Sequence, residues 1–226
     1  MIKNIINPID MKEKQLYIKG KSFMYRGEEE TLTDKPNPNL SKQDQKDLLH
    51  CVSSLFNEKK IQFYLGYGTL LGAIRDSDFI KGDNDIDLMI TKKYESILYE
   101  NLPYFQNRGL KLIRFYDHKS YSFRINDKTF VDVYVLSTDS TITTSLFYRC
   151  GIPGWLIPRI FFVIPSYVDF IGQRFLIPSF SKYLLRCWYG RDWRIPQSKK
   201  GTYDFREIGI CKIISKFWTK LFLNEK

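Results

Sequence analysis

The chain has 226 residues and a mass of 26.9 kDa, a size that favours one large domain over two small ones. Hydrophobic residues make up 43% of the sequence and charged residues 27%, which excludes a disordered or fibrous protein. The net charge of +10 is uneven, since residues 1–140 hold 21 basic and 20 acidic residues, whereas residues 141–226 hold 14 and 5. Such a basic segment attracts nucleic acid, an anionic membrane surface or an acidic substrate, and composition does not choose among them.

Cysteine usage and the N-terminus bear on the compartment. The four cysteines form no CxxC pair and only two histidines occur, so we expect neither a zinc site nor a disulfide framework. The first twenty residues lack the apolar stretch of a signal peptide. We therefore expect a cytoplasmic protein with reduced thiols.

The first 40 residues are polar and mixed, and we interpret residues 1–40 as an N-terminal extension. Within it, Gln15–Ile18 and Ser22–Tyr25 are expected to pair as a small hairpin. A helix should follow, because Ser41 and Asp44 have the spacing of a capping box and apolar residues then recur at helical spacing.

The next elements predict a mixed sheet flanked by helices. The expected strands are 61–65, 85–90, 111–116, 121–126 and 129–136, and the expected helices are 70–75 and 92–101, the second ended by Pro103. This order is typical of an α/β or α+β domain, which we assign to residues 41–140.

The last third of the chain is different. Residues 155–171 are strongly apolar and aromatic, and they approach the roughly 20 residues that span a bilayer. Arg159, Asp169 and the prolines at 158 and 165 argue against a spanning helix. Two interpretations stay open: helices or loops packed in the core, or a segment lying on a membrane surface. We interpret residues 141–226 as a basic, aromatic-rich helical part packed on the core.

Asp85 and Asp87 open an expected strand and give the strongest functional signal. Side chains at i and i+2 point to the same face of a strand, so these carboxylates would repel unless a cation lies between them. Asp132 interrupts an apolar strand, where a lone ionised carboxylate is costly to bury. Oxygen ligands of this kind suit Mg²⁺ or Mn²⁺, and three of them predict a phosphoryl-transfer site.

A glycine–threonine turn, Gly68-Thr69, follows the first strand of the expected sheet and opens the next helix. Backbone N–H groups at such a position bind phosphate, and glycine permits close approach. Arg75 and Lys81 could neutralise phosphate charge. Each signal alone is weak, since surface loops carry Asp-x-Asp pairs and Asp132 could pair with an arginine. In this order, they together predict metal-dependent phosphoryl or nucleotidyl transfer.

These residues resemble the signature of the LicD family, which includes bacterial phosphocholine transferases and fukutin-type proteins. The matching blocks, in order, are Leu65-Gly66-Tyr67-Gly68-Thr69-Leu70-Leu71-Gly72-Ala73-Ile74-Arg75, Phe79-Ile80-Lys81-Gly82-Asp83-Asn84-Asp85-Ile86-Asp87, Phe130-Val131-Asp132-Val133-Tyr134, and Tyr183-Leu184 with Tyr189-Gly190-Arg191-Asp192-Trp193 and Pro196. Two positions depart from the family pattern: Gly82 stands where a tryptophan is usual, and Asn84 replaces an aspartate. The smaller Gly82 leaves more room beside the site, so the resemblance does not fix choline as the transferred group.

The resemblance implies a nucleotidyltransferase-like fold and a reaction that moves a phospho-substituent, phosphocholine or a similar alcohol phosphate, from a CDP-linked donor to a sugar hydroxyl. CMP would be released, and the acceptor would be a cell-surface glycan such as lipopolysaccharide, teichoic acid or capsule, often built on a lipid carrier. The implied catalytic and metal-binding residues are Asp85, Asp87 and Asp132. The implied substrate-binding residues are Gly68, Thr69, Arg75, Lys81, Asp83, Asp192 and Trp193, of which the last two could instead close the core. Peripheral binding to the inner face of the cell membrane stays open.

Other functions also stay open. An NTP-dependent nucleotidyltransferase acting on a small molecule would share the carboxylates but release pyrophosphate. A nucleic-acid-binding module would use the basic segment and show salt-sensitive binding that ignores the carboxylates. A catalytically silent glycan-binding relative is disfavoured by the intact aspartates. Because no known nucleic-acid-binding motif occurs, we expect no nucleic acid partner, and we expect the basic charge to face an anionic membrane or a phosphorylated acceptor.

Overall fold

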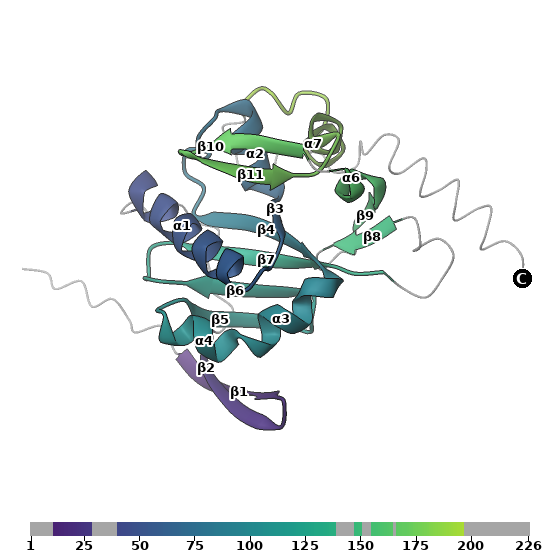
Figure 1. The fold of residues 1–226 in the computed structure, drawn as a ribbon. Coiled ribbons are helices and arrows are strands. Elements are labelled where there is room, and N and C mark those ends of the chain that lie inside the picture. Colours follow the sequence, from purple (N-terminus) through teal and green to yellow (C-terminus); the bar gives the residue numbers. More distant parts are fainter. Residues whose placement is uncertain (1–10, 29–39, 139–146, 151–154, 165, 197–226) are drawn as a thin grey trace, which may run out of the picture.

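A five-stranded mixed sheet lies at the centre of the molecule (Figure 1). The computed structural model describes residues 11–28, 40–138, 147–150, 155–164 and 166–196. In order across the sheet, the strands are β3 (Phe63–Leu65), β4 (Asp85–Thr91), β7 (Phe130–Leu136), β6 (Ser120–Arg124) and β5 (Lys111–Tyr116). β4 and β7 run parallel and the other neighbours run antiparallel, which confirms the predicted α+β fold with a mixed sheet.

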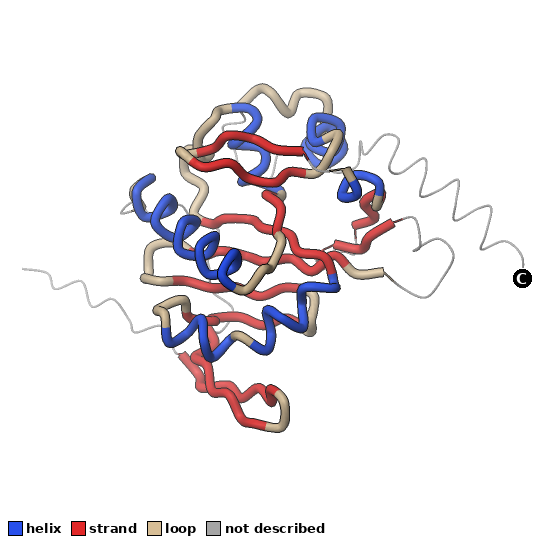
Figure 2. The backbone as a smooth tube through the Cα atoms, viewed as in Figure 1, coloured by secondary structure: helices blue, strands red, loops and turns tan. Residues whose placement is uncertain are grey.

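Helices cover one face of this sheet (Figure 2). They are α1 (Lys42–Glu58), α3 (Glu95–Glu100) and α4 (Leu102–Asn107), with the 3₁₀ turn η1 (Lys92–Tyr94) leading into α3. Phe56 of α1 contacts Phe63, the cross-strand neighbour of Ile90, so Ile86, Leu88 and Ile90 of β4 point towards the helices. The alternate residues of β4, which include its two aspartates, point to the other face, towards α2 (Tyr67–Arg75) and C-terminal segments.

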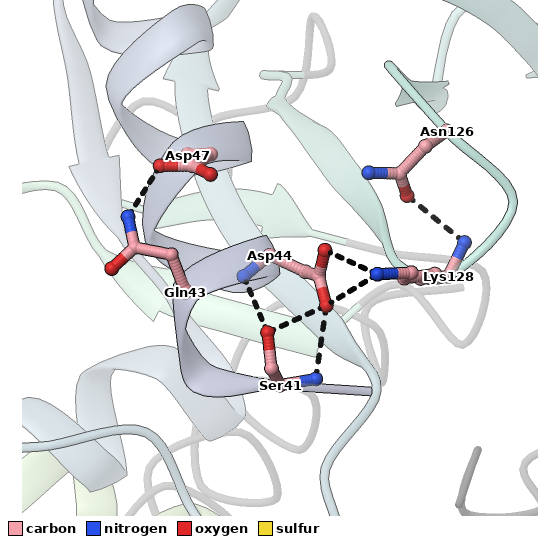
Figure 3. Close-up of polar contacts among 6 residues, drawn as sticks. All are labelled: Ser41, Gln43, Asp44, Asp47, Asn126 and Lys128. Atoms are coloured by element: carbon pink, nitrogen blue, oxygen red, sulfur yellow. Dashed lines mark hydrogen bonds and ion pairs between the residues drawn. The ribbon is translucent and has the colours of Figure 1, made fainter. Parts of the chain in front are cut away.

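The capping box predicted at the start of α1 is present, and it also ties the helix to a loop (Figure 3). The Ser41 hydroxyl accepts from the Asp44 N–H at 3.1 Å, and the Asp44 carboxylate accepts from the Ser41 N–H at 3.0 Å. The same carboxylate pairs with Lys128 at 2.9 Å. The hydrogen bond from the Ser41 side chain, and then that from Lys128, lower the pKa of Asp44 to about 2. Lys128 precedes β7, so the start of α1 and the start of this strand are held together.

The predicted N-terminal hairpin is also present, and it is longer than the sequence indicates. β1 (Met11–Ile18) and β2 (Lys21–Glu28) pair antiparallel along their whole length. The turn residues Lys19 and Gly20 both have positive φ, as in a two-residue hairpin turn. The hairpin buries Phe23 and Tyr25 and lies beside β5, so it extends the core at that edge of the sheet.

Two predicted helix boundaries were wrong. Pro103 does not end a helix, because α3 already ends at Glu100 and Pro103 lies in the first turn of α4. Proline is tolerated there, since the first N–H groups of a helix have no partner within it. Helix α2 begins at Tyr67, before the predicted start at Leu70, with Gly66 as its N-cap.

The C-terminal part contains strands as well as helices. Its described elements are β8 (Phe147–Cys150), β9 (Trp155–Pro158), α6 (Ile160–Val163), β10 (Ser166–Phe170), β11 (Gln173–Ile177) and α7 (Ser181–Tyr189). The helical prediction therefore holds for α6 and α7, whereas most of residues 155–171 contribute strands to two hairpins. The β10–β11 turn at Ile171 and Gly172 has positive φ at both residues, which matches the twist of the strands.

One continuous hydrophobic core includes residues from the hairpin, the sheet and the C-terminal part. The division into residues 1–40, 41–140 and 141–226 stays a prediction, and much of the basic C-terminal charge, in residues 197–226, lies outside the described residues. None of the helices in the described parts of the chain combines the length and apolar composition needed to cross a lipid bilayer.

Candidate active site

The pairing of β4 with β7 brings the predicted aspartates to one face of the sheet. Asp87 and Asp132 are direct partners in the parallel register, and neighbouring strands lie about 4.8 Å apart. Asp85 precedes Asp87 by two residues and therefore points to the same face. Carboxylates that lie more than 40 residues apart in the sequence thus become neighbours because their strands are parallel and in this register.

The turn between β3 and α2 holds Asp87 in place. The Gly68 N–H donates to Asp87 Oδ2 at 2.8 Å, and the Asp87 N–H donates to Thr69 Oγ1 at 2.8 Å. The Gly66 N–H donates to the Asp87 carbonyl at 2.9 Å. Binding of phosphate by Gly68 and Thr69 stays a prediction, and in the structure both residues hold Asp87. Their clear role is to orient a carboxylate at the start of a helix, where negative charge is favoured.

Gly68 is also required by the space around it. A Cβ at this position would lie 2.7 Å from Asp83 Oδ2 and 3.2 Å from Asp87 Oδ2. Asp83 therefore comes close to the turn from the loop that precedes β4. Only a residue without a side chain lets both carboxylates approach the backbone of α2 here.

The site strongly disfavours charge on its central carboxylates. Asp87 is only 7% exposed, and its pKa is raised well above the ordinary value by burial and then by the charges of Asp85, Asp83 and Asp132. Burial also raises the pKa of Asp132, although hydrogen bonding and a nearby arginine oppose that rise. Carboxylates that repel one another in a buried place become stable together when a cation neutralises them.

This donor set fits a hard divalent cation, since every candidate ligand is a carboxylate oxygen. Among the described residues, however, no three Asp, Glu, His or Cys side chains already converge as a ready metal site. A bound cation would therefore have to draw the carboxylates of Asp85, Asp87 and Asp132 towards itself. Side-chain rotation suffices for this, because the strands already place the Cα atoms on one face.

Asp132 has two partners that the sequence analysis missed, Ser122 and Tyr134, and an arginine neighbour of the kind that it allowed. Ser122 is its cross-strand partner in β6 and donates a hydrogen bond to Oδ1, while the Tyr134 hydroxyl lies 3.4 Å from Oδ2. The guanidinium of Arg114 in β5 lies 3.9 Å from Oδ1. The available signal was a serine between Tyr121 and Phe123 in an apolar strand, but only the register shows what it faces.

The loop before β4 is held from two sides. The Gln45 side chain of α1 donates to the Asp83 carbonyl at 3.0 Å, and the Thr129 hydroxyl donates to the Asn84 carbonyl at 2.9 Å. Gln45 is only 3% exposed, so this amide is a buried polar group with a specific structural role. Gly82 in the same loop has φ +82°, which explains why glycine suits this position better than the tryptophan usual in the resembled family.

Residues 60–179, just over half of the chain, match the model of a family described as "LicD/FKTN/FKRP, nucleotidyltransferase domain". The chain belongs to this family. It is 24% identical over 174 residues to the ribitol-5-phosphate transferase FKTN of Homo sapiens, an alignment that covers 73% of this chain and 36% of that protein. It is 28% identical over 108 residues to the uncharacterized protein RP689 of Rickettsia prowazekii (strain Madrid E), covering 47% of this chain and 39% of that protein. The chain thus spans less than two fifths of these relatives.

Among solved structures, the fold is similar to that of the antibiotic-resistance factor ANT(2″)-Ia. The TM-score is 0.50 at 13% sequence identity, over 81% of this chain and 95% of that one. At this identity the likeness concerns the fold alone, and it agrees with the nucleotidyltransferase domain of the LicD/FKTN/FKRP family.

The remaining residues named from the family signature are more dispersed. Arg75 donates two hydrogen bonds to the neighbouring Asp76, at 2.8 and 2.7 Å, and its side chain is largely buried. Lys81 is exposed in the loop before β4. Trp193 is 2% exposed and belongs to the hydrophobic core, as the core-closing alternative predicts, whereas Asp192 is exposed.

An aromatic cluster next to the carboxylates connects the family core to the C-terminal part. Tyr67 stacks on Trp188 of α7 with ring centroids 4.6 Å apart, and it meets Tyr134 edge-on at 4.9 Å. The Tyr67 hydroxyl donates to Cys150 Sγ at 3.2 Å. Burial raises the pKa of Tyr67 well above its ordinary value, so the phenol stays neutral. This contact network joins α2, β7, β8 and α7 beside the site.

Proposed function

We propose that this protein transfers a phospho-substituent from a CDP-linked alcohol to a sugar hydroxyl of a cell-surface glycan and releases CMP. The observation that supports this best is the paired Asp87 and Asp132, with Asp87 oriented by the turn that opens α2. Family membership favours a transferase of phosphate-containing groups. Because one relative is a ribitol-5-phosphate transferase, we propose ribitol phosphate or a similar alcohol phosphate, such as phosphocholine, as the group that moves.

Mg²⁺ or Mn²⁺ would be held by Asp85, Asp87 and Asp132. When bound, the cation supplies charge neutralisation for the donor's phosphates. Gly68 and Thr69 would keep Asp87 in place for cation binding through the two hydrogen bonds described above. The mutual repulsion of the carboxylates favours cation binding, because a bound positive charge relieves it.

Asp132 is the proposed proton acceptor. The sugar oxygen attacks the phosphorus that carries the alcohol, the bond from this phosphorus to the CMP oxygen breaks, and the hydroxyl proton passes to an Asp132 carboxylate oxygen. Ser122 and Tyr134 fix its orientation, so the accepting oxygen stays aimed in one direction.

The test is CMP release by the purified protein with Mg²⁺, a glycan extract as acceptor, and CDP-ribitol, CDP-glycerol and CDP-choline as donors. We expect metal-dependent CMP release that Asp87→Asn and Asp132→Asn abolish. Asp117→Asn is the matched control, because it makes the same chemical change at an exposed turn. Binding of Mn²⁺ followed by electron paramagnetic resonance gives a readout independent of turnover, and Asp87→Asn should weaken it.

Each other outcome has a definite meaning. Pyrophosphate release from an NTP, with no CMP from any CDP-alcohol, would replace the proposal by nucleotidyl transfer to a small molecule. CMP release that survives both aspartate substitutions would remove the proposed site. Salt-sensitive nucleic acid binding that is indifferent to Asp87 would favour a binding module instead.

We also propose that the protein binds peripherally to an anionic membrane on its cytoplasmic side, where lipid-linked acceptors would be presented. Four large apolar side chains are exposed close together on α6 and the segment before α7: Ile160, Val163, Ile164 and Phe180. The rings of Phe180 and Phe161 have centroids 5.4 Å apart, and the Ser179 hydroxyl donates to the Ile164 carbonyl, so the two segments lie side by side. Arg159 and Lys182 adjoin this apolar patch, a combination that suits anionic lipid.

Flotation with vesicles of phosphatidylglycerol and phosphatidylcholine tests this surface. Wild-type protein should float at low salt, and a Val163→Ser/Phe180→Asn variant should stay at the bottom. Tyr17→Ser, which removes a similarly exposed aromatic ring from the hairpin, is the control and should float. Equal flotation of the variant, or no flotation at low salt, contradicts the proposal.

A further inference from the structure

A cavity lies at the carboxyl end of β4, away from the aspartates at the start of this strand. It has a volume of about 620 Å³, within the range of small-molecule sites. Three of the described residues that line it are cationic, namely Lys92, Lys93 and Arg159, and none of these described lining residues is acidic. Lys92 is paired with Glu95 at 2.6 Å, whereas Lys93 lies over the ring of Tyr94 with its ammonium 4.6 Å from the centroid. The cavity is therefore positive.

Thr91 gives an independent sign of a ligand. This residue lines the cavity and is 8% exposed, and no group among the described residues hydrogen-bonds to its buried hydroxyl. A buried hydroxyl without a partner is costly, and native proteins rarely keep one without a reason. Rotation about the Cα–Cβ bond exchanges the hydroxyl with the methyl group, so the hydroxyl can turn towards a ligand in the cavity.

The rest of the wall is rigid and aromatic. The Gln62 amide is fixed between two tyrosine hydroxyls, donating to Tyr64 at 2.9 Å and accepting from Tyr94 at 3.0 Å. The Phe162 ring meets Tyr64 and Tyr148 edge-on, at 5.0 and 5.5 Å. Cations and a hydroxyl beside aromatic rings suit an anionic group attached to a sugar, because the rings accept the apolar faces of the sugar.

The position of the cavity relates it to the proposed reaction. Thr91 lies on the same face of β4 as Asp85 and Asp87, by the alternation of side chains along the strand. Thr91 lies four positions after Asp87, which corresponds to about 13 Å along an extended strand. Met89 lies between them on this face and is fully buried, so an acceptor would have to pass around this side chain to reach both places.

We propose that this cavity binds a phosphate-bearing group of the acceptor glycan, recognised by Lys93, Arg159 and the Thr91 hydroxyl. The assignment to the acceptor rests on the proposed function, whereas the binding of a phosphate-bearing sugar can be measured without it. The cavity would select acceptors that already carry phosphate at a fixed distance from the reacting hydroxyl.

The experiment is isothermal titration of metal-free protein with three probes: maltose 1-phosphate, maltose and inorganic phosphate. Maltose 1-phosphate should bind most tightly. Lys93→Glu should weaken its binding at least tenfold, because the substitution reverses an exposed charge. Thr91→Val should weaken it several-fold without lowering the melting temperature, since valine has the same shape and removes the unpaired hydroxyl. Lys21→Glu, the same reversal at an exposed position in the N-terminal hairpin, should bind like wild type.

An Asp85→Asn/Asp87→Asn variant separates this proposal from the proposed function. It should bind maltose 1-phosphate as tightly as wild type. If it does so while wild-type protein releases no CMP from any CDP-alcohol, the binding site is supported and the proposed reaction is rejected. Maltose binding as tightly as its phosphate, or unchanged binding to Lys93→Glu, overturns the phosphate assignment. Inorganic phosphate binding as tightly as maltose 1-phosphate overturns the assignment to a glycan and leaves a site for free phosphate.

Discussion

Two glycines of α2 should respond differently to the same substitution, Gly68→Ala and Gly72→Ala. A Cβ at Gly68 meets only the ends of carboxylate side chains, at 2.7 and 3.2 Å. A Cβ at Gly72 would lie 2.5 Å from the Asp78 carbonyl oxygen and 3.3 Å from the Ile80 nitrogen, both of them backbone atoms. Side chains can rotate away from a collision, whereas the backbone at Asp78 and Ile80 can move only by shifting the loop that carries the buried Phe79.

The magnitudes follow from these contacts. Alanine gains about 1 kcal/mol over glycine within a helix. At Gly68 this gain roughly offsets the displacement of the Asp83 carboxylate, so the free energy of unfolding should change by less than about 1 kcal/mol. At Gly72 the collision is about 1 Å inside the optimal contact distance, and overpacking of this kind costs about 1–3 kcal/mol or more. The net loss should lower the melting temperature by about 2–4 °C per kcal/mol.

The two substitutions should affect activity in the opposite order, with the larger loss of activity at Gly68. Gly68→Ala displaces carboxylates at the proposed cation site, and a misplacement of about 1 Å can reduce turnover about 100-fold. Gly72→Ala should keep most of its activity at temperatures where it is folded. Urea unfolding, Mn²⁺ binding and CMP release on both variants check this. If Gly68→Ala is as active as wild type, the contacts around Gly68 do not determine activity. If Gly72→Ala is as stable as wild type, the backbone contacts around Gly72 do not limit its size.

Three further predictions concern single side chains. Asp87→Asn should abolish transfer and raise the melting temperature of the metal-free protein, because burial and neighbouring carboxylates disfavour the ionised form of Asp87. Thermal melts with and without Mg²⁺ check this, and a lower melting temperature of the metal-free variant would contradict it. Ser122→Ala should reduce transfer about tenfold, since the serine hydrogen bond orients the Asp132 carboxylate; unchanged transfer would mean that this orientation is not needed. The hydrogen bond from Ser41, and then that from Lys128, lower the pKa of Asp44 to about 2. Ionised Asp44 therefore stabilises the fold at pH values above the ordinary carboxyl pKa, and this contribution is lost as the pH falls towards 2. Acid unfolding of Asp44→Asn should show a smaller loss of stability over this pH range.

The sequence was sufficient where a local pattern decides the outcome. Asp85 and Asp87 fall on one face by strand alternation alone, and the capping box of Ser41 and Asp44 needs only a spacing of three residues. The place of Asp132 beside Asp87 required one more assumption, that their strands are neighbours in the right register, and the structure confirms this pairing.

The remainder depends on contacts that no local pattern encodes. Ser122 and Gln45 look like an ordinary strand serine and helix glutamine, and only tertiary pairing shows that they hold Asp132 and the loop before β4. The hairpin strands β9 and β10 were missed because they lie in a long, mainly apolar stretch that was interpreted as one segment. The glycine–threonine turn was recognised as important, yet its hydrogen bonds hold a carboxylate, a role that spacing alone does not distinguish from phosphate binding.

The way the site is built suggests where substrate choice is decided. The carboxylates are fixed from within residues 40–138, by the turn at Gly68, by Ser122 and by the clamp of Gln45 on the loop before β4. The aromatic wall beside them and the positive cavity instead take residues from the C-terminal part, including Trp188 and Arg159. Changes in that part could therefore alter which of the proposed donors and acceptors fit without moving the proposed catalytic carboxylates. A family that transfers different alcohol phosphates would be expected to vary in these contacts while its aspartates stay in place.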